Sequence, residues 1–190
     1  MTSGSFLRIT VQMNSEYAIS VSAGSESCSI MEDQRQQQFE ALLREHQGIV
    51  FKVANTYCWH SDDRADLAQD IVTQLWRAWP RYDPSRTFST WMYRVALNVA
   101  ISHVRKAARD REIALPLDEN LHDAPAALDV HALHNRLQGF IERQPPLDRA
   151  LLLLYLEDRS QREIAEILGI TQTNVSTKIN RLKQKIRAEL

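Results

Sequence analysis

The apolar residues of this chain return at steps of three and four along most of its length, which constrains the fold more than any other feature. From Arg162 to Arg187, in REIAEILGITQTNVSTKINRLKQKIR, this spacing runs on both sides of a single glycine. Apolar side chains at such steps fall on one face of an α-helix. The 190 residues include only 5 glycines and 6 prolines, which disfavours a turn-rich β fold. The sequence therefore predicts an all-α protein.

The same stretch predicts two helices joined by a tight turn. Gly169 suits the left-handed position that ends a helix, and Thr171 can cap the next helix through its hydroxyl. The apolar stripe of that second helix is formed by Val175, Ile179, Leu182 and Ile186. This arrangement is typical of a helix-turn-helix, whose second helix can enter the major groove of DNA.

With that stripe buried, the other side chains of the second helix must face elsewhere. Amides and hydroxyls at the start of a recognition helix can bond base edges, and cations further on can contact phosphates. The polar candidates are Gln172, Thr173, Asn174, Ser176, Thr177, Lys178 and Asn180, and the cationic ones are Arg181, Lys183, Lys185 and Arg187. A solvated basic helix in a protein-binding bundle is the alternative. The cap, the glycine and the spacing together favour DNA.

Charge is distributed unevenly, although the formal net charge is only −1. Residues 35–109 hold eleven Lys/Arg against seven Asp/Glu, residues 110–130 hold one against six, and residues 169–190 hold five against one. Two basic blocks therefore flank an acidic strip, and the near-neutral total does not argue against nucleic-acid binding. The strip has two prolines and no helical stripe, which predicts an extended linker.

These patterns divide the chain into four segments. Residues 1–34 are rich in Ser and Thr and predict a disordered tail; the alternative is a start codon assigned too early, with Met31 as the true start. Residues 35–109 predict a first small helical domain, and residues 131–190 a second one. The acidic linker at residues 110–130 joins the two domains.

Local signals place two long helices in the first domain. Ser61 precedes a run with acids in its first turn, so we expect it to be the N-cap, and Pro80 predicts the end of that helix. A loop with a second proline follows. The next helix has an apolar stripe that we expect to be buried in the core: Trp91, Val95, Val99 and Ser102.

Several other classes of protein lack support. No apolar run approaches the roughly 18 residues of a membrane span. The N-terminus is not a secretory signal, and the two cysteines form no disulfide framework, so a cytoplasmic location is the simpler expectation. Cys58 with His60, and His131 with His134, are too few for a zinc site, which needs about four ligands. Without a phosphate-binding loop or a nucleophile motif, we expect no enzymatic activity, no metal and no cofactor.

Three stretches in this order carry a resemblance to a known family: DLAQDIVTQLWRAW, FSTWMYRVALNVAISHVRK and the terminal helix-turn-helix. The chain resembles bacterial sigma factors of the sigma-70 type, and more narrowly the extracytoplasmic-function (ECF) group, which keeps only the second and fourth sigma domains. The resemblance covers roughly Phe39 to Leu190. It implies binding to core RNA polymerase and to promoter DNA, with an anti-sigma factor as a further partner. A stand-alone helix-turn-helix regulator and a helical adaptor are the alternatives.

The resemblance also implies roles for residues of the first domain. The first stretch matches the polymerase-binding helix, with candidates Asp66, Gln69, Asp70, Gln74 and Trp76. A solvated acidic face is the alternative there. The next stretch matches the segment that captures the −10 element as single-stranded DNA, by stacking and by hydrogen bonds to base edges. Its candidates are Tyr82, Phe88, Trp91, Arg94, Asn98, Arg105 and Lys106, with a core position as the alternative for Trp91.

The terminal helix resembles the reader of the −35 element, with candidates Gln172, Thr173, Asn174, Ser176, Thr177, Lys178, Asn180, Arg181 and Lys185. Leu97 stands where the family pattern has an arginine, and Asn180 replaces a frequent histidine. We therefore expect the same docking but a distinct promoter sequence. The acidic linker is expected to follow the path of nascent RNA, its charges standing in for phosphates; a plain spacer is the alternative.

Overall fold

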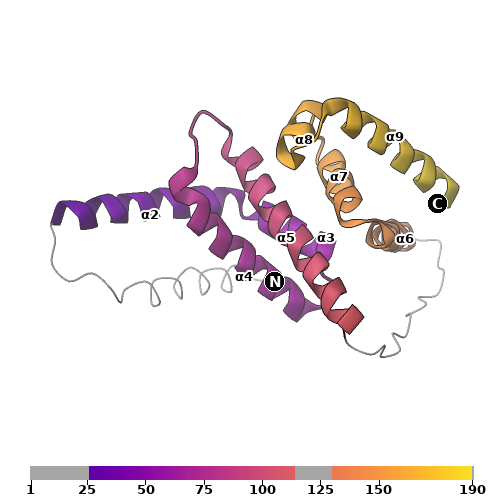
Figure 1. Cartoon of the computed structure of the whole chain (residues 1–190), viewed down its shortest axis with the longest axis horizontal. Coiled ribbons are helices and arrows are strands. Elements are labelled where there is room, and N and C mark those ends of the chain that lie inside the picture. The colour runs from indigo at the N-terminus through magenta and orange to yellow at the C-terminus, as the bar shows by residue number, and fades with distance from the viewer. Residues whose placement is uncertain (1–25, 114–129, 190) are drawn as a thin grey trace. The chain divides into compact units, whose positions relative to one another are not determined.

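The computed structural model describes residues 26–113 and 130–189, and every regular element in these two ranges is helical (Figure 1). The elements are α2 (Glu26–His46), α3 (Gly48–Tyr57), α4 (Ser61–Ala78), the 3₁₀ turn η1 (Trp79–Arg81), α5 (Phe88–Ile113), α6 (Val130–Arg143), α7 (Pro146–Leu156), α8 (Gln161–Leu168) and α9 (Gln172–Glu189). The predicted all-α fold is confirmed. Among the described helices, none is long and apolar enough to cross a lipid bilayer.

The chain up to Glu45 forms a unit of its own, in which α2 is the described element. The predicted tail lies outside the described residues as far as residue 25. Helix α2 begins at Glu26, so it overlaps the end of the segment predicted as a tail, residues 26–34. Residues 32–38 are mostly Glu, Gln and Arg, which are good helix formers without being apolar. The helix therefore begins before the buried apolar residues Phe39 and Leu43.

In the second unit, which begins at His46, the helices α3, α4 and α5 pack against one another (Figure 1). Apolar side chains with almost no exposed surface fill the space between them: Val50, Val53, Leu67, Ile71, Leu75, Met92 and Leu97. Full burial of one such side chain contributes about 1.5–3 kcal/mol. This core fixes the distance between α4 and α5, on which the candidate site depends.

The buried face of α5 is not the one that the sequence predicts. The predicted stripe is half-buried at three positions and exposed at the last: Trp91, Val95, Val99 and Ser102. Residues with almost no exposed surface lie one or two positions further along: Met92, Ala96, Leu97 and Ala100. Both faces carry apolar residues, so periodicity alone could not choose between them. The two alanines let neighbouring helices approach closely, and the predicted stripe remains as a partly exposed apolar strip.

The start of α4 differs from the prediction, whereas its end agrees with it. The expected N-cap, Ser61, is the first helical residue, and its hydroxyl contacts Asp62 Oδ1 at 3.1 Å instead of accepting a bond from the helix backbone. His60 occupies the cap position in an extended conformation. At the other end α4 stops at Ala78, and Pro80 lies inside η1. The chain thus leaves the α-helix before the proline, as the steric demand of proline on the preceding turn requires.

In the C-terminal part, α7, α8 and α9 pack together, and α6 packs on α7. Their buried apolar residues are Phe140, Leu151, Leu154, Ile164, Ile167, Val175, Ile179 and Leu182. The predicted stripe of the terminal helix is therefore buried, apart from half-buried Ile186. Most of the predicted linker lies outside the described residues. Helix α5 continues through residue 110 to Ile113 and α6 begins at Val130, so both helices extend into the predicted linker.

Contacts within the second unit also connect α3 to α7 and α5 to α8. The buried Tyr57 hydroxyl donates a hydrogen bond to the carbonyl oxygen of Pro146 at 2.6 Å. Two ion pairs between partly exposed side chains accompany it: Lys52–Glu157 (2.5 Å) and Arg86–Glu166 (3.1 Å). Water screens such pairs, so each contributes at most about 1 kcal/mol.

Gly169 allows a test of the turn before α9. Its φ is +67°, and an added Cβ would meet no atom within 4 Å, so Gly169→Ala should cost backbone strain alone. We expect a loss of about 1 kcal/mol in the free energy of unfolding, measured by urea denaturation. Gly48→Ala is the matched control: Gly48 also has open space, and it begins α3 without a positive φ. It should leave stability unchanged or raise it. Equal losses from both changes would contradict the left-handed assignment.

Candidate functional site

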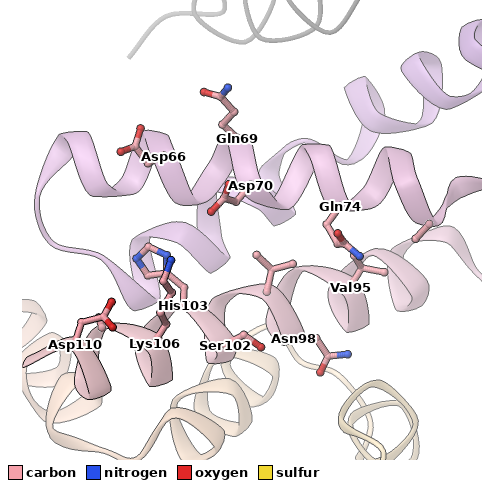
Figure 2. Close-up of a pocket in the computed structure, with 13 residues that line it drawn as sticks. Asp66, Gln69, Asp70, Gln74, Val95, Asn98, Ser102, His103, Lys106 and Asp110 are labelled. Carbon is pink, nitrogen blue, oxygen red and sulfur yellow. The ribbon is translucent and has the colours of Figure 1, made fainter. Parts of the chain in front are cut away.

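A groove with a volume of about 960 Å³ lies between α4 and α5 (Figure 2). From α4 it is lined by polar side chains on one helical face: Asp66, Gln69, Asp70 and Gln74. From α5 come the partly exposed strip at Val95 and Val99, followed by Asn98, Ser102, His103, Lys106 and Asp110. The buried face of α5 includes Ala96 and Ala100. Val95 and Val99, the residues just before them, therefore stay partly exposed and line the groove.

Figure 2 shows how the polar groups are arranged along the groove. The exposed carboxylates of Asp66 and Asp70 project from α4, one helical turn apart, while Lys106 and Asp110 extend from the far end of α5. Asn98 is exposed at the edge of the groove on α5, and its amide points away from α4. Acidic and amide groups thus surround an apolar floor. Such a surface suits a partner that combines cations with apolar side chains.

The groove unites residues that the sequence assigns to two different partners. Four of the five polymerase-binding candidates line it, and so do the −10 candidates Asn98 and Lys106. Trp76 is half-buried and does not line it. The remaining −10 candidates lie outside it as well: Tyr82, Phe88, Trp91, Arg94 and Arg105. Arg94 and Arg105 are exposed.

Four aromatic rings pack together before and at the start of α5. Trp79 stacks on Tyr82 at a centroid distance of 5.0 Å, and Phe88 lies 5.3 Å from Trp91 and 5.6 Å from Tyr82. Trp79 and Phe88 are each only 6% exposed, so Phe88 belongs to the core of this cluster and offers no free face for stacking. Tyr82 and Trp91 remain half-buried, with part of each ring accessible.

The ring cluster is continued by an ordered loop between η1 and α5. The Tyr82 hydroxyl donates a hydrogen bond to the carbonyl oxygen of Arg86 at 2.9 Å. The Asp83 carboxylate accepts one from the backbone N–H of Ser85, also at 2.9 Å, and this bond lowers the pKa of Asp83. The loop is therefore shaped by its own bonds and by the rings on either side of it.

A different environment surrounds Cys58, the thiol that follows α3. It is buried, and desolvation raises its pKa, which disfavours the reactive thiolate. His60 is exposed. The side chains of His131 and His134 lie outside the described residues. Among the described side chains, no three His, Cys, Asp or Glu residues form a group that could hold a metal ion.

In the helix-turn-helix, the start of α8 is fixed by a capping box. The Ser160 hydroxyl accepts a hydrogen bond from the Glu163 N–H, and the Glu163 carboxylate accepts one from the Ser160 N–H at 3.0 Å. Hydrogen bonds that the Glu163 carboxylate accepts from the Ser160 hydroxyl and from the Ser160 N–H lower the pKa of Glu163. The helix ends at Gly169, which is left-handed as predicted, and the Thr171 hydroxyl accepts from the Asn174 N–H at 3.2 Å. Both predicted turn residues are confirmed.

The outer face of α9 carries most of the predicted −35 residues. Its exposed candidates are Gln172, Thr173, Asn174, Thr177, Asn180, Arg181 and Lys185, while Ser176 and Lys178 are half-buried. The Thr177 hydroxyl donates to the carbonyl oxygen of Thr173 at 3.0 Å, so those two side chains lie one above the other. The polar groups therefore form a continuous strip opposite the buried stripe.

Sequence reasoning missed Asp148, an acid in the first turn of α7. Its side chain is only 3% exposed and lies 3.1 Å from Lys178 Nζ and 3.6 Å from the Arg181 guanidinium. In the sequence it is an ordinary first-turn acid, favoured there by the helix dipole. Because its partners are thirty or more positions away, no local pattern indicates the pairing.

Two family models match the chain. The model described as Sigma-70 region 2 matches residues 42–110, and the one described as Sigma-70, region 4 matches residues 134–186. The first match contains the groove and the ring cluster, and the second contains the helix-turn-helix. The chain belongs to the sigma-70 family.

Curated relatives place this sigma factor in the ECF group, which confirms the resemblance seen in the sequence. The ECF RNA polymerase sigma factor SigE of Mycolicibacterium smegmatis is 29% identical over 155 residues, which are 78% of this chain and 60% of the relative. The ECF RNA polymerase sigma factor SigW of Bacillus subtilis is 28% identical over 171 residues, which are 82% of this chain and 90% of the relative. The chain thus spans less than two thirds of SigE but most of SigW.

Two solved structures share the fold of this sigma factor. CnrH in complex with the cytosolic domain of CnrY has a TM-score of 0.59 at 23% identity, covering 84% of this chain and 94% of that one. The sigma factor RpoE in complex with the anti-sigma factor NepR from Bartonella quintana also has a TM-score of 0.59, at 16% identity, covering 80% and 94%. The expected pair of helical sigma domains is therefore confirmed at the level of the fold.

The capping box of α8 generates a pH-dependent prediction. Ser160→Ala should lower the free energy of unfolding by about 1 kcal/mol at pH 7, because it removes the cap of the helix-turn-helix. The pKa of Glu163 is lowered from 4.5 in the fold, so its contribution is present above pH 4.5 and is lost as the pH falls below that value. Urea titrations at pH 7 and pH 3.5 should show a smaller difference between wild type and Ser160→Ala at the lower pH.

Glu163→Gln is the companion variant for this experiment. It retains a side chain that can reach back to the Ser160 N–H but cannot ionise, so the part of the acid-induced loss that depends on Glu163 should disappear. A difference between wild type and Ser160→Ala that stays constant over this pH range would contradict the role of the Glu163 carboxylate in the cap.

Proposed function

We propose that this sigma factor binds core RNA polymerase through the α4 side of the groove, reads the −10 element with α5 and its preceding loop, and reads the −35 element with α9. Membership of the sigma-70 family establishes promoter-specific transcription initiation as the general role. The groove supports the assignment of α4 to polymerase and of α5 to the −10 element. It is lined by acidic and amide side chains from α4 and by the Asn98 amide from α5. We infer that the chain fulfils this role by binding and positioning its partners, without catalysing a chemical step.

The polymerase-facing part of the proposal rests on the exposed face of α4. Asp66, Gln69, Asp70 and Gln74 lie at helical steps on one side, and all four are exposed. Two carboxylates one turn apart attract a basic surface over about a Debye length, roughly 8–10 Å at physiological salt. The apolar floor formed by Val95 and Val99 would add a desolvated contact, which gives the interface affinity as well as orientation.

For the −10 strand, the proposal assigns separate tasks to separate residues. Asn98 presents an exposed amide that can donate to and accept from a base edge. Tyr82 and Trp91 retain accessible ring surface for stacking, worth about 1–3 kcal/mol per base. The exposed cations Arg94, Arg105 and Lys106 are suited to phosphates. Phe88 supports the loop from within the ring cluster.

For the −35 element, the polar strip of α9 supports docking in a major groove. The side chains of Gln172, Thr173 and Asn174 are exposed in the first turn, where recognition helices contact bases. Thr177 and Asn180 continue the same strip. Hydroxyls and amides read bases through hydrogen bonds, so this helix is suited to sequence discrimination rather than to strong electrostatic attraction.

An anti-sigma factor is proposed as a further partner, and the cytoplasm, where transcription takes place, as the location. Both solved structures described above are complexes: CnrH with the cytosolic domain of CnrY, and RpoE with the anti-sigma factor NepR. The groove and the outer face of α9 are the surfaces that such a partner would have to cover. The acidic linker at residues 110–130 is proposed to follow the RNA path in the complex with polymerase.

Polymerase binding can be tested by charge reversal on α4. Asp66→Lys with Asp70→Lys should weaken association with core RNA polymerase at least tenfold, because like charges would then face the basic partner surface; titration of labelled chain with core enzyme measures this. The control is Asp62→Lys with Asp63→Lys, which makes the same charge change in the first turn of α4, outside the groove. If both double variants lose equal affinity, or neither loses any, the groove is not the polymerase site.

The −10 assignment can be tested with Asn98→Ala. In run-off transcription with core enzyme and a promoter library randomised at the −10 element, the variant should lose about tenfold discrimination at one base position, since about 1–1.5 kcal/mol is typical of a lost hydrogen bond. Affinity for core enzyme should stay within twofold of wild type. Asn55→Ala, which removes an exposed amide on α3, is the control and should retain the wild-type base preference. Unchanged preference at every position in Asn98→Ala would refute the assignment.

A further inference from the structure

Helix α9 has five cationic side chains, and four of them contact other groups of the protein. Lys178 and Arg181 lie on one flank, where both contact the Asp148 carboxylate. On the same flank Lys185 Nζ lies 3.4 Å from Gln144 Oε1. On the opposite flank the Lys183 ammonium lies 4.5 Å from the centre of the Tyr155 ring. Within residues 136–189, Arg187 is the cation of α9 for which the structure gives no such partner.

The pairing of Asp148 with Lys178 is the most protected of these contacts. The side chain of Asp148 is 3% exposed and that of Lys178 is 27% exposed, whereas that of Arg181 is 60% exposed. A buried carboxylate without a counter-charge is costly, so this carboxylate must keep a cation beside it. Arg181 can leave for solvent or for a phosphate at little cost, but Lys178 cannot. The ammonium of Lys178 is therefore committed to α7.

The position of Asp148 also controls which side of α9 faces outward. Asp148 lies in the first turn of α7, where the backbone N–H groups and the helix dipole stabilise a negative charge. Together with the buried stripe at Val175, Ile179 and Leu182, it fixes the rotation of α9 about its own axis. That rotation presents the strip of Thr173, Thr177 and Asn180 to a partner.

We propose that Asp148 is a positioning residue for the recognition helix, which withholds Lys178 from DNA phosphates and thereby raises the share of binding that depends on base sequence. The inference rests on the proposed −35 function of α9. Phosphate contacts supply nearly all non-specific affinity, because each one releases counter-ions irrespective of sequence. Withholding a cation at the centre of the helix lowers the affinity for every sequence equally, so a larger share of the remaining binding free energy depends on base contacts.

The test is the salt dependence of DNA binding by the full-length chain. Two duplexes serve as probes: one recovered by the wild-type chain from a randomised pool, and a scrambled duplex of the same composition. In Asp148→Asn, Lys178 loses its counter-charge and becomes available to phosphate. The slope of log affinity against log salt should steepen by about 0.9 per freed cation on both duplexes. The ratio of the two affinities should stay the same, because the freed cation strengthens binding to both duplexes equally. A side chain with only a structural role would make binding weaker and the slope no steeper.

Two further variants separate the positioning role from a general change of charge. Lys178→Met alone should leave the slope within error of wild type, because that ammonium does not reach the DNA. Asp148→Asn combined with Lys178→Met should return the slope toward wild type. Asp158→Asn is the matched control: it removes the same charge from the exposed loop before α8, where φ is +54° and asparagine is tolerated. It should leave the slope unchanged.

Each outcome decides between the two proposals. A slope for folded Asp148→Asn that equals that of wild type, or of Asp158→Asn, overturns the positioning role but leaves the −35 function intact. A slope shallower by about 0.9 in Lys178→Met also overturns it, because Lys178 would then contact phosphate directly. Should Asp148→Asn be unfolded by circular dichroism, Lys178→Met and the double variant decide the question. Failure of the wild-type chain to bind either duplex at low salt would contradict the DNA-binding role of α9 itself.

Discussion

The burial of one face of α5 positions most of what this sigma factor presents to its partners. Its core residues, two of them alanines, pack into the space between α3 and α4 and have almost no exposed surface. That packing sets the distance from the α4 carboxylates to Asn98 across the groove and leaves Val95 and Val99 as the groove's partly exposed floor. The first turn of the same helix holds Phe88 within the ring cluster that shapes the preceding loop. A substitution that rotates α5 would therefore alter the groove and the loop together.

Acidic and basic groups are distributed differently over the molecule, which the net charge of −1 does not reveal. Acidic groups of α4 are exposed at the groove, whereas most cations of α9 contact partners within their own domain. Electrostatic attraction is thus strongest where a protein partner is proposed and weakest where base sequence has to be read. A basic composition of the recognition helix alone would suggest the reverse, since lysines and arginines near DNA usually indicate phosphate contacts.

Local sequence signals predicted the structure correctly at positions where one residue type determines the backbone conformation. Gly169 and Thr171 are examples, because a left-handed turn and a hydroxyl cap each depend on one side chain. The buried face of α5 was predicted one or two residues away from its true position, since two adjacent faces of that helix are apolar. The burial of Phe88 and the pairing of Asp148 could not be read from the sequence, because both depend on tertiary contacts. The sequence likewise did not predict that the α4 and α5 candidates share one groove, because it assigned the two helices to different partners.

The ion pair between Arg86 and Glu166 has a geometric consequence. Arg86 belongs to the loop proposed to meet the −10 strand, and Glu166 lies in the first helix of the helix-turn-helix, with their charged groups 3.1 Å apart. Promoter elements at −10 and −35 are separated by about 25 base pairs, or about 85 Å of straight duplex at 3.4 Å per base pair. A chain in which these two segments touch cannot span that length. Engagement of both proposed elements would thus require this exposed bridge to break.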